Sequence, residues 1–196
     1  MLRGFLTTLL SWMAMQSATP AVRVAIETEM GRITIEVDVA HAPITSANFL
    51  RYVNEQFYDG GRFHRTVRPD TEPRRDSPIQ VIQGGVNPAR ASSAYAAIPL
   101  ERTSLTGLSH VDGAVSMARA GPDTARSDIF ICVGDQKALD FGGARNADGQ
   151  GFAVFGRVVA GMAVVRRIQA APVRDGSQTL SPPIAILSAR VLEGPR

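Results

Sequence analysis

Two segments of this chain are apolar on both faces, and this feature constrains the fold most strongly. They are "DIFICV" at 128–133 and "AVFGRVV" at 153–159. Successive side chains of a strand point to opposite faces, so such strands must be covered on both sides. A closed β-barrel meets this need, because one face fills the interior and the other lies under a helix or lines a groove.

The remaining segments predict about eight strands and two helices in one domain. Alternating apolar residues predict a hairpin over 22–39 and strands over 62–67, 79–85, 113–118, 127–134, 152–159 and 183–193. Helices are predicted within 41–61, with Pro43 in the first turn and Gly60-Gly61 as the stop, and within 161–171. Residues 68–78 are predicted to form a polar surface loop, and 87–110 irregular connections.

Composition and charge exclude several classes of function. The net charge is +3, with 21 basic and 18 acidic residues and no long basic block, which argues against nucleic-acid binding. Three scattered histidines and the single Cys132 offer no metal-ligand spacing, and Cys132 in an apolar run is expected to be a core residue. The glycine-rich loops lack the Gly-Lys-Ser/Thr ending of a phosphate loop, so phosphate binding is only a weak alternative. No cofactor is expected.

The first 18 residues have the pattern of an export signal. Arg3 is followed by an uncharged apolar run from Gly4 to Met15 and then by the small residues Ser17 and Ala18, although Gln16 makes the cleavage site imperfect. The run is too short for a comfortable membrane span. We therefore predict a signal peptide or disordered leader at 1–18 and a folded domain at 19–196, which is periplasmic or secreted. The alternatives are an uncleaved anchor and a cytoplasmic protein that does not use the leader.

Strand alternation also predicts which polar and aromatic side chains share a face. In 62–67, Phe63, Arg65 and Val67 share a face, and an arginine there is costly to desolvate unless something needs it. Residues that share faces in the other strands are Ile79, Val81 and Gln83; Asp128, Phe130 and Cys132; and Phe152 and Val154. An arginine, a glutamine and two phenylalanines can thus converge on one outer surface. The alternatives are an Arg65 side chain that reaches solvent at a barrel edge and phenylalanines that only fill the core.

The order of several motifs indicates a family. The segments "FYDGGRFHR", "VIQGG", "SMARAGPDTARSDIFIC", "LDFGG" and "GFAVFGRVVAGMAVVRRI" follow one another with plausible gaps. Together they resemble the cyclophilin family of peptidyl-prolyl cis-trans isomerases, from about Val22 to about Leu192. The resemblance implies a closed eight-stranded antiparallel β-barrel capped by two α-helices, with the active groove on its outer wall. It also implies an enzyme that needs no metal or cofactor.

The resemblance assigns roles to individual residues. It implies that Arg65 is the catalytic arginine, with Gln83 beside it and Phe130 as the aromatic wall of the proline pocket. The residues that it places against the substrate are Val81, Met117, Ala118, Arg119, Asp128, Leu139 and Phe152, and in 117–119 it is the backbone that holds the substrate.

Several positions depart from the family pattern. Gln80 and Val81 stand where members usually carry Phe-Met, so the pocket is expected to be shallower or differently closed. Asp128 stands where many members have glutamine, and if it points into the groove it is expected to pair with Arg65 and compete with substrate. Ala138 stands where some members carry the tryptophan that binds cyclosporin, so tight inhibition is not expected. The charged loop at 68–78 is longer than is usual.

The predicted function is acceleration of X–Pro bond rotation during protein folding, with Arg65 donating a hydrogen bond to the prolyl nitrogen. The partners expected are proline-containing peptides and unfolded chains, bound by a monomer. The alternative is a non-catalytic cyclophilin-like module that binds proline-containing segments.

Overall fold

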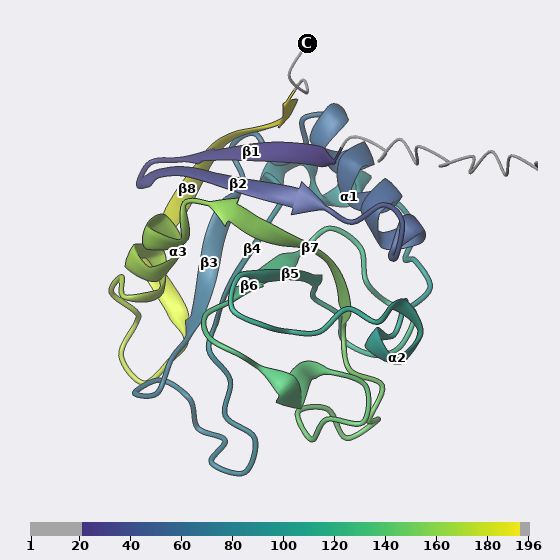
Figure 1. Ribbon diagram of the computed structural model, residues 1–196. Helices are drawn as coiled ribbons and strands as arrows, with labels where there is room; N and C mark the ends of the chain where they lie inside the picture. The colour runs from purple at the N-terminus through teal and green to yellow at the C-terminus, as the bar shows by residue number, and fades with distance from the viewer. Residues whose placement is uncertain (1–20, 193–196) are drawn as a thin grey trace, which may run out of the picture.

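Eight antiparallel strands close into one barrel in the computed structural model, which describes residues 21–192 (Figure 1). Around the barrel the order is β1-β2-β7-β5-β6-β4-β3-β8. The strands are β1 (Val22–Thr28), β2 (Gly31–Val37), β3 (Arg62–Val67), β4 (Val81–Gly85), β5 (Ala114–Met117), β6 (Ile129–Cys132), β7 (Ala153–Ala160) and β8 (Thr179–Leu192). The predicted fold class is confirmed, although β8 begins earlier than the sequence pattern indicated.

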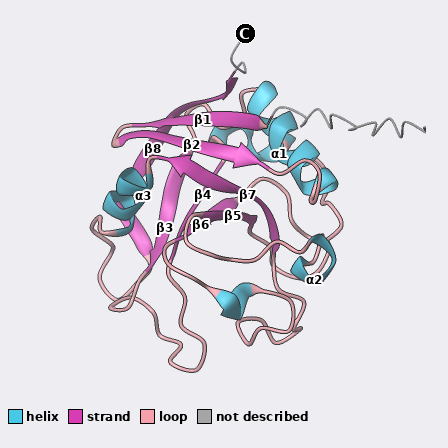
Figure 2. Cartoon of the chain, in the orientation of Figure 1, coloured by secondary structure: helices cyan, strands magenta, loops and turns pink. Residues whose placement is uncertain are grey.

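Two helices pack against the barrel, as predicted (Figure 2). They are α1 (Pro43–Asn54), which buries Phe49, Tyr52 and Val53, and α3 (Met162–Gln169), which buries Val165 and Ile168. The prediction that Gly60-Gly61 stop the first helix was wrong, because turns follow Asn54. Segments expected to be irregular contain a one-turn helix α2 (Thr103–Thr106) and the 3₁₀ helix η1 (Pro88–Ser93), and a further 3₁₀ helix η2 (Lys137–Leu139) precedes the 142–151 loop.

Two apolar clusters lie on opposite faces of the strands. In β6, Ile129 and Ile131 belong to the main core, whereas Phe130 and Cys132 belong to a second cluster on the other face. β7 divides in the same way, with Phe155 in the main core and Val154 in the second cluster. The strands that are apolar on both faces are therefore covered on both, as the sequence predicts.

The side chains of β3 do not follow the simple alternation that we predicted. Phe63 lies in the main core, whereas Val67 lies in the second cluster, so the two do not share a face. The cause is a shift of register between Phe63 and Arg65 against both β4 and β8, which leaves His64 without a partner residue in either ladder. A β-bulge of this kind inserts one extra residue and reverses the alternation beyond it. The bulge sends Arg65 to the outer face.

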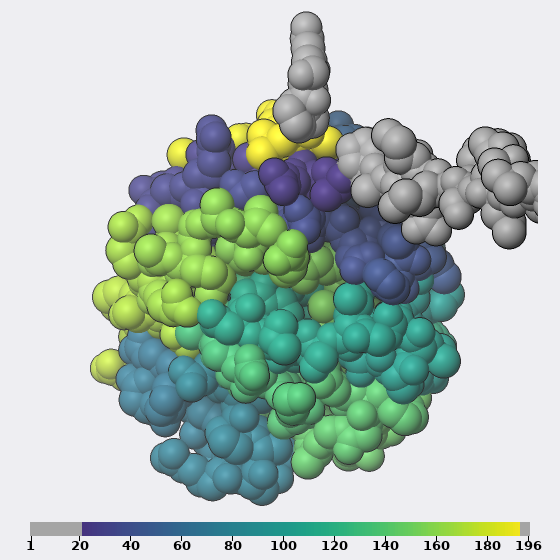
Figure 3. Space-filling model, viewed as in Figure 1, coloured from purple at the N-terminus to yellow at the C-terminus, as the bar shows by residue number. Residues whose placement is uncertain are grey.

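The loop at 68–78 is fastened to the barrel rather than projecting freely. Arg68 donates hydrogen bonds to the carbonyls of Gln169 and Ala171, at 2.8 and 2.9 Å. Glu72 is only 3% exposed and pairs with Arg145 from the 142–151 loop, with 2.8 Å between Arg145 Nη1 and Glu72 Oε2. Figure 3 shows the two loops as neighbouring lobes, one blue and one green, at the bottom of the view. Together they extend the barrel's outer wall.

Three further findings concern the described residues, 21–192. Within this range no helix is long and apolar enough to cross a membrane, and no group of His, Cys, Asp or Glu is arranged to hold a metal ion. Cys132 is fully buried, and burial raises the pKa of its thiol, so it is the core residue that we predicted. The predicted leader at 1–18 lies outside the described residues.

Candidate active site

A pocket of about 220 Å³ on the outer wall of the barrel gathers eight of the ten predicted site residues. Its lining comes from β3, β4 and β6, from η2, and from the segments beside β5 and β7. The lining residues are Arg65, Ile79, Val81, Gln83, Ala118, Arg119, Phe130, Leu139, Arg145, Asn146 and Phe152. The pocket therefore sets polar and cationic side chains, among them Arg65 and Gln83, beside an apolar wall.

The apolar wall is built around two phenylalanines. The rings of Phe130 and Phe152 meet edge to face, with centroids 5.3 Å apart and planes at 86°. Leu139 completes this side and is almost fully buried. Edge-to-face pairs are favourable because the positive ring edge meets the negative ring face. The two rings therefore form an ordered, apolar wall. Such a slot suits a small apolar ring such as that of proline.

Arg65 is held on two sides by amide oxygens. Its Nη1 donates to Gln83 Oε1 at 2.9 Å, and its Nε and Nη2 donate to Gln178 Oε1 at 3.0 and 2.6 Å. Burial lowers the pKa of the guanidinium from its usual value, with a nearby Arg145 acting in the same direction and Glu72 opposing it. An arginine remains protonated at neutral pH even so. Arg65 is thus a fixed, cationic hydrogen-bond donor at the edge of the slot.

Asp128 does not pair with Arg65, so the predicted competition with substrate for the guanidinium is not supported. Its Oδ2 accepts a hydrogen bond from Gln83 Nε2 at 3.4 Å and lies 3.7 Å from His64 Nε2. Gln83 stands between the two charged groups, which is the physical reason that they do not meet. Asp128 lies outside the pocket lining, and its contact with the site is the hydrogen bond that it accepts from Gln83.

The side chains of Met117 and Arg119 are not free to contact a substrate. The Met117 side chain is 1% exposed and points into the barrel core, so only its backbone is on the side of the groove wall. The Arg119 guanidinium binds both carboxylate oxygens of Asp148, at 2.8 and 2.9 Å, and lies 5.0 Å from the centroid of the Phe152 ring. Arg119 therefore fastens the 142–151 loop over the wall of the slot.

A buried polar network supports Phe130 from beneath. The ring of His110 stacks on Phe130 at 5.7 Å, and its Nδ1 lies 2.6 Å from Asp140 Oδ1 and its Nε2 3.0 Å from Ser116 Oγ. A neutral ring with the proton on Nδ1 satisfies both neighbours, because it donates to the carboxylate and accepts from the hydroxyl. Burial lowers the pKa of His110 below 6.5, with Asp140 opposing the shift.

This network predicts acid sensitivity of the fold. Below pH 6.5, the usual histidine pKa, the unfolded chain takes up a proton that buried His110 resists. The free energy of unfolding is therefore expected to fall as the pH drops from 7 toward 5, and to fall less in His110→Asn. Urea titrations of both proteins at pH 5, 6 and 7 measure the difference, with the exposed His41 and the half-buried His64 common to both. Parallel pH profiles would show that His110 does not resist protonation.

Four residues at or beside the pocket were not predicted as site residues. Ile79 shares a strand face with Val81 and Gln83, so strand alternation could have predicted it as a lining residue. Arg145 and Asn146 come from a glycine-rich loop, and Gln178 lies 113 residues along the chain from its partner Arg65. No local pattern links these three to the pocket, because the contacts arise only when the barrel closes.

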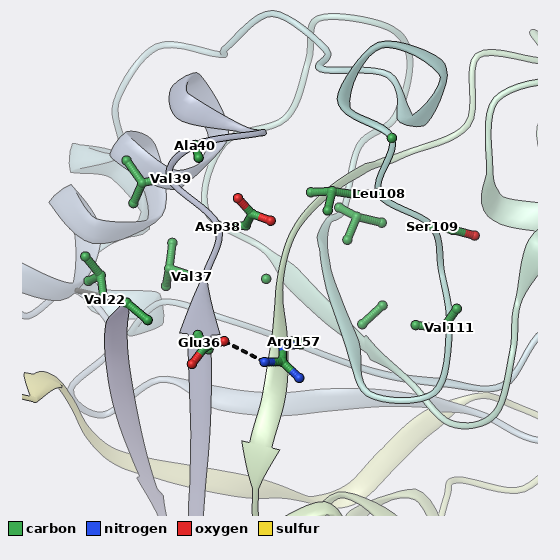
Figure 4. Close-up of a pocket in the computed structure, with 15 residues that line it drawn as sticks. Val22, Glu36, Val37, Asp38, Val39, Ala40, Leu108, Ser109, Val111 and Arg157 are labelled. Carbon is green, nitrogen blue, oxygen red and sulfur yellow. Dashed lines mark hydrogen bonds and ion pairs between the residues drawn. The ribbon is translucent and has the colours of Figure 1, made fainter. Parts of the chain in front are cut away.

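A larger hollow, of about 780 Å³, lies elsewhere on the surface (Figure 4). Val37 and Val39 face Leu108 and Val111 across it, and Glu36 pairs with Arg157 at 2.7 Å. None of the ten predicted site residues lines this hollow. The predicted chemistry therefore belongs to the smaller pocket.

The fold and the pocket define a class of protein, a closed antiparallel barrel with a cationic donor beside an apolar slot on its outer wall. Comparison with known proteins identifies the family. Residues 23–191 match the family model described as cyclophilin type peptidyl-prolyl cis-trans isomerase. This chain belongs to the cyclophilin-type peptidyl-prolyl cis-trans isomerases, a family of enzymes.

Comparisons with individual proteins lead to the same family. The chain is 34% identical over 181 residues to peptidyl-prolyl cis-trans isomerase A of Dickeya dadantii, covering 90% of this chain and 88% of that protein. It is 37% identical over 150 residues to a peptidyl-prolyl cis-trans isomerase of Acinetobacter baylyi, covering 76% and 72%. A crystal structure of a Cryptosporidium parvum cyclophilin shares the fold, with a TM-score of 0.71 at 20% identity, over 90% of this chain and 100% of that one.

Proposed function

We propose that this chain accelerates rotation about X–Pro bonds by hydrogen bonding from Arg65 to the prolyl nitrogen. One observation carries the proposal: the Arg65 guanidinium is fixed beside the slot formed by Phe130, Leu139 and Phe152. A donor with a set direction and a site for the proline ring are the two elements that the reaction needs.

The physical argument starts from the amide bond. Rotation breaks amide resonance, with a barrier of about 18–20 kcal/mol. In the twisted state the prolyl nitrogen becomes pyramidal and its lone pair accepts a hydrogen bond that the planar amide accepts poorly. A donation from Arg65 therefore stabilises the twisted state more than the ground state, which is the condition for catalysis. The low polarity of the slot strengthens this interaction, because little water competes for the donor.

The rest of the pocket restrains one side of the bond while the other turns. The proline ring is held against Phe130 and Phe152, and the backbone near Ala118 is placed to hold the flanking substrate chain. A monomer suffices, since all the lining residues come from one chain. The substrates proposed are proline-containing segments of unfolded proteins. A Cryptosporidium parvum cyclophilin crystallised in the presence of the dipeptide Ala-Pro supports this substrate class.

A rate measurement on the wild-type chain tests the function against its alternative. The protein is added in catalytic amounts to a peptide with an Ala–Pro bond, after a jump that displaces its cis/trans equilibrium. We expect relaxation to accelerate in proportion to protein concentration. Binding of the peptide without acceleration would instead identify a non-catalytic module that grips proline-containing segments.

We further propose that the chain acts outside the cytoplasm, in the periplasm or after secretion. The sequence of residues 1–18, with Arg3 before an uncharged apolar run, supports export. N-terminal sequencing of the protein from the periplasmic fraction tests this proposal. A mature chain that begins near residue 19 is expected, and a full-length chain confined to the cytoplasm would contradict it.

A further inference from the structure

We propose that Gln178 is a positioning residue for Arg65, and this inference rests on the proposed function of Arg65. Gln178 precedes β8, and its backbone carbonyl accepts from the amide of Thr66 at 2.8 Å, next to Arg65 in β3. Its side chain then turns to the guanidinium. Backbone and side chain thus hold the same short segment of β3.

The hydrogen bonds of Arg65 show what Gln178 contributes. A guanidinium has five N–H donors in one plane. Gln178 Oε1 accepts from two of them, on Nε and Nη2, and Gln83 Oε1 accepts one from Nη1. Within residues 21–192 the remaining two N–H groups have no protein acceptor. Because Gln178 fixes the Nε edge of the plane, it decides where those two donors point.

The amide of Gln178 is itself fixed in one orientation. Its Nε2 donates to the carbonyl of Thr71, in the 68–78 loop, at 3.1 Å. A flipped amide would set its NH₂ group against the donors of Arg65 and its oxygen against the Thr71 carbonyl, and both contacts are repulsive. The longer loop therefore has a role at the site, because it supplies the acceptor that locks Gln178.

The two side chains that hold Arg65, those of Gln83 and Gln178, are uncharged. Gln83 and Gln178 orient the guanidinium without an ion pair, and the described residues form no salt bridge with Arg65. A carboxylate in either place would attract the guanidinium and offset its charge. Amide oxygens leave the positive charge directed toward the slot.

A double-mutant cycle with Arg65 tests this inference through kinetics. Gln178→Met keeps the length of the side chain and removes the acceptor, and it is expected to lower kcat/KM about 5- to 20-fold while KM changes less than about twofold. In an Arg65→Ala background the same change is expected to cost less than about twofold, because Gln178 acts through Arg65. Equal losses in both backgrounds would overturn the inference.

A second readout does not depend on activity. In ¹⁵N spectra the Arg65 Nε–H is expected to exchange with water at least about tenfold faster in Gln178→Met than in wild type. Gln136→Met is the matched control, since it also removes amide hydrogen bonds, to Gln80 N and Val133 O, and neither of these involves Arg65. Unchanged Nε–H exchange in Gln178→Met would reject the positioning role. A wild-type chain that fails to catalyse rejects the proposed function instead, whatever this signal shows.

Discussion

Replacing Arg65 with alanine is expected to lower kcat/KM for an Ala–Pro peptide about 10- to 150-fold. A hydrogen bond from a charged group contributes about 1.5–3 kcal/mol, and about 1.4 kcal/mol corresponds to a tenfold change in rate. The loss appears in kcat as well as in kcat/KM, with KM little changed, because the donor acts in the twisted state. Arg65→Lys is expected to recover little of the activity, since an ammonium cannot bind both Gln83 and Gln178 as a planar fork does. A coupled or fluorescence-based isomerisation assay measures all three proteins.

The control for this experiment is another arginine on the barrel surface. Arg157→Ala removes a guanidinium that is 67% exposed and pairs with Glu36 in the larger hollow. It is expected to leave kcat/KM within about twofold of wild type. An Arg65→Ala protein that is correctly folded and equally active would refute the proposed mechanism, whatever the other variants show.

Replacing Glu72 with alanine is expected to reduce the free energy of unfolding by about 3–5 kcal/mol. Glu72 is 3% exposed, and its carboxylate accepts from the Arg145 guanidinium and from the backbone amides of Arg74 and Ile79. Removing it leaves the nearly buried Arg145 cation without a counter-ion, and two backbone amides without this acceptor. Chemical denaturation measures the global loss, and trypsin cleavage after Arg74 or Arg75 reports loosening of the 68–78 loop.

Two comparisons give this stability prediction its meaning. Glu27→Ala breaks the exposed pair with Arg32 on the β1–β2 hairpin and is expected to cost less than about 1 kcal/mol. The double variant Glu72→Leu/Arg145→Met removes both buried charges and is expected to recover much of the loss, because no ion is left unpaired. A Glu72→Ala protein as stable as wild type would show that the two loops are not joined by this pair.

Strand periodicity predicted most of the fold, because the pattern of apolar residues along a strand shows whether one face or both faces are buried. The segment around Phe130 shows this best, because its two faces divide between the main core and the outer cluster. The same rule failed in β3, where the bulge at His64 separates Phe63 from Arg65. A bulge is set by how neighbouring strands pair, which the local sequence does not specify.

The candidate site was predicted only where its residues lie in strands or follow the family motifs. Arg65, Gln83 and Phe130 come from neighbouring strands β3, β4 and β6, so their convergence follows once the barrel order is known. Gln178 and Arg145 come from loops that are distant in sequence, and nothing in the local pattern assigns them a partner. The Asp128 expectation failed for a related reason, because the side chain of Gln83 occupies the space between it and Arg65.

NMR exchange spectroscopy on a bound Ala–Pro peptide, with wild type and Arg65→Ala, tests the central claim most directly, because it separates rotation from binding. The account predicts that Arg65→Ala binds the peptide with a Kd within about threefold of wild type, while cis/trans exchange of the bound proline slows at least about tenfold. Bound-state exchange that is equally fast without the guanidinium would contradict it.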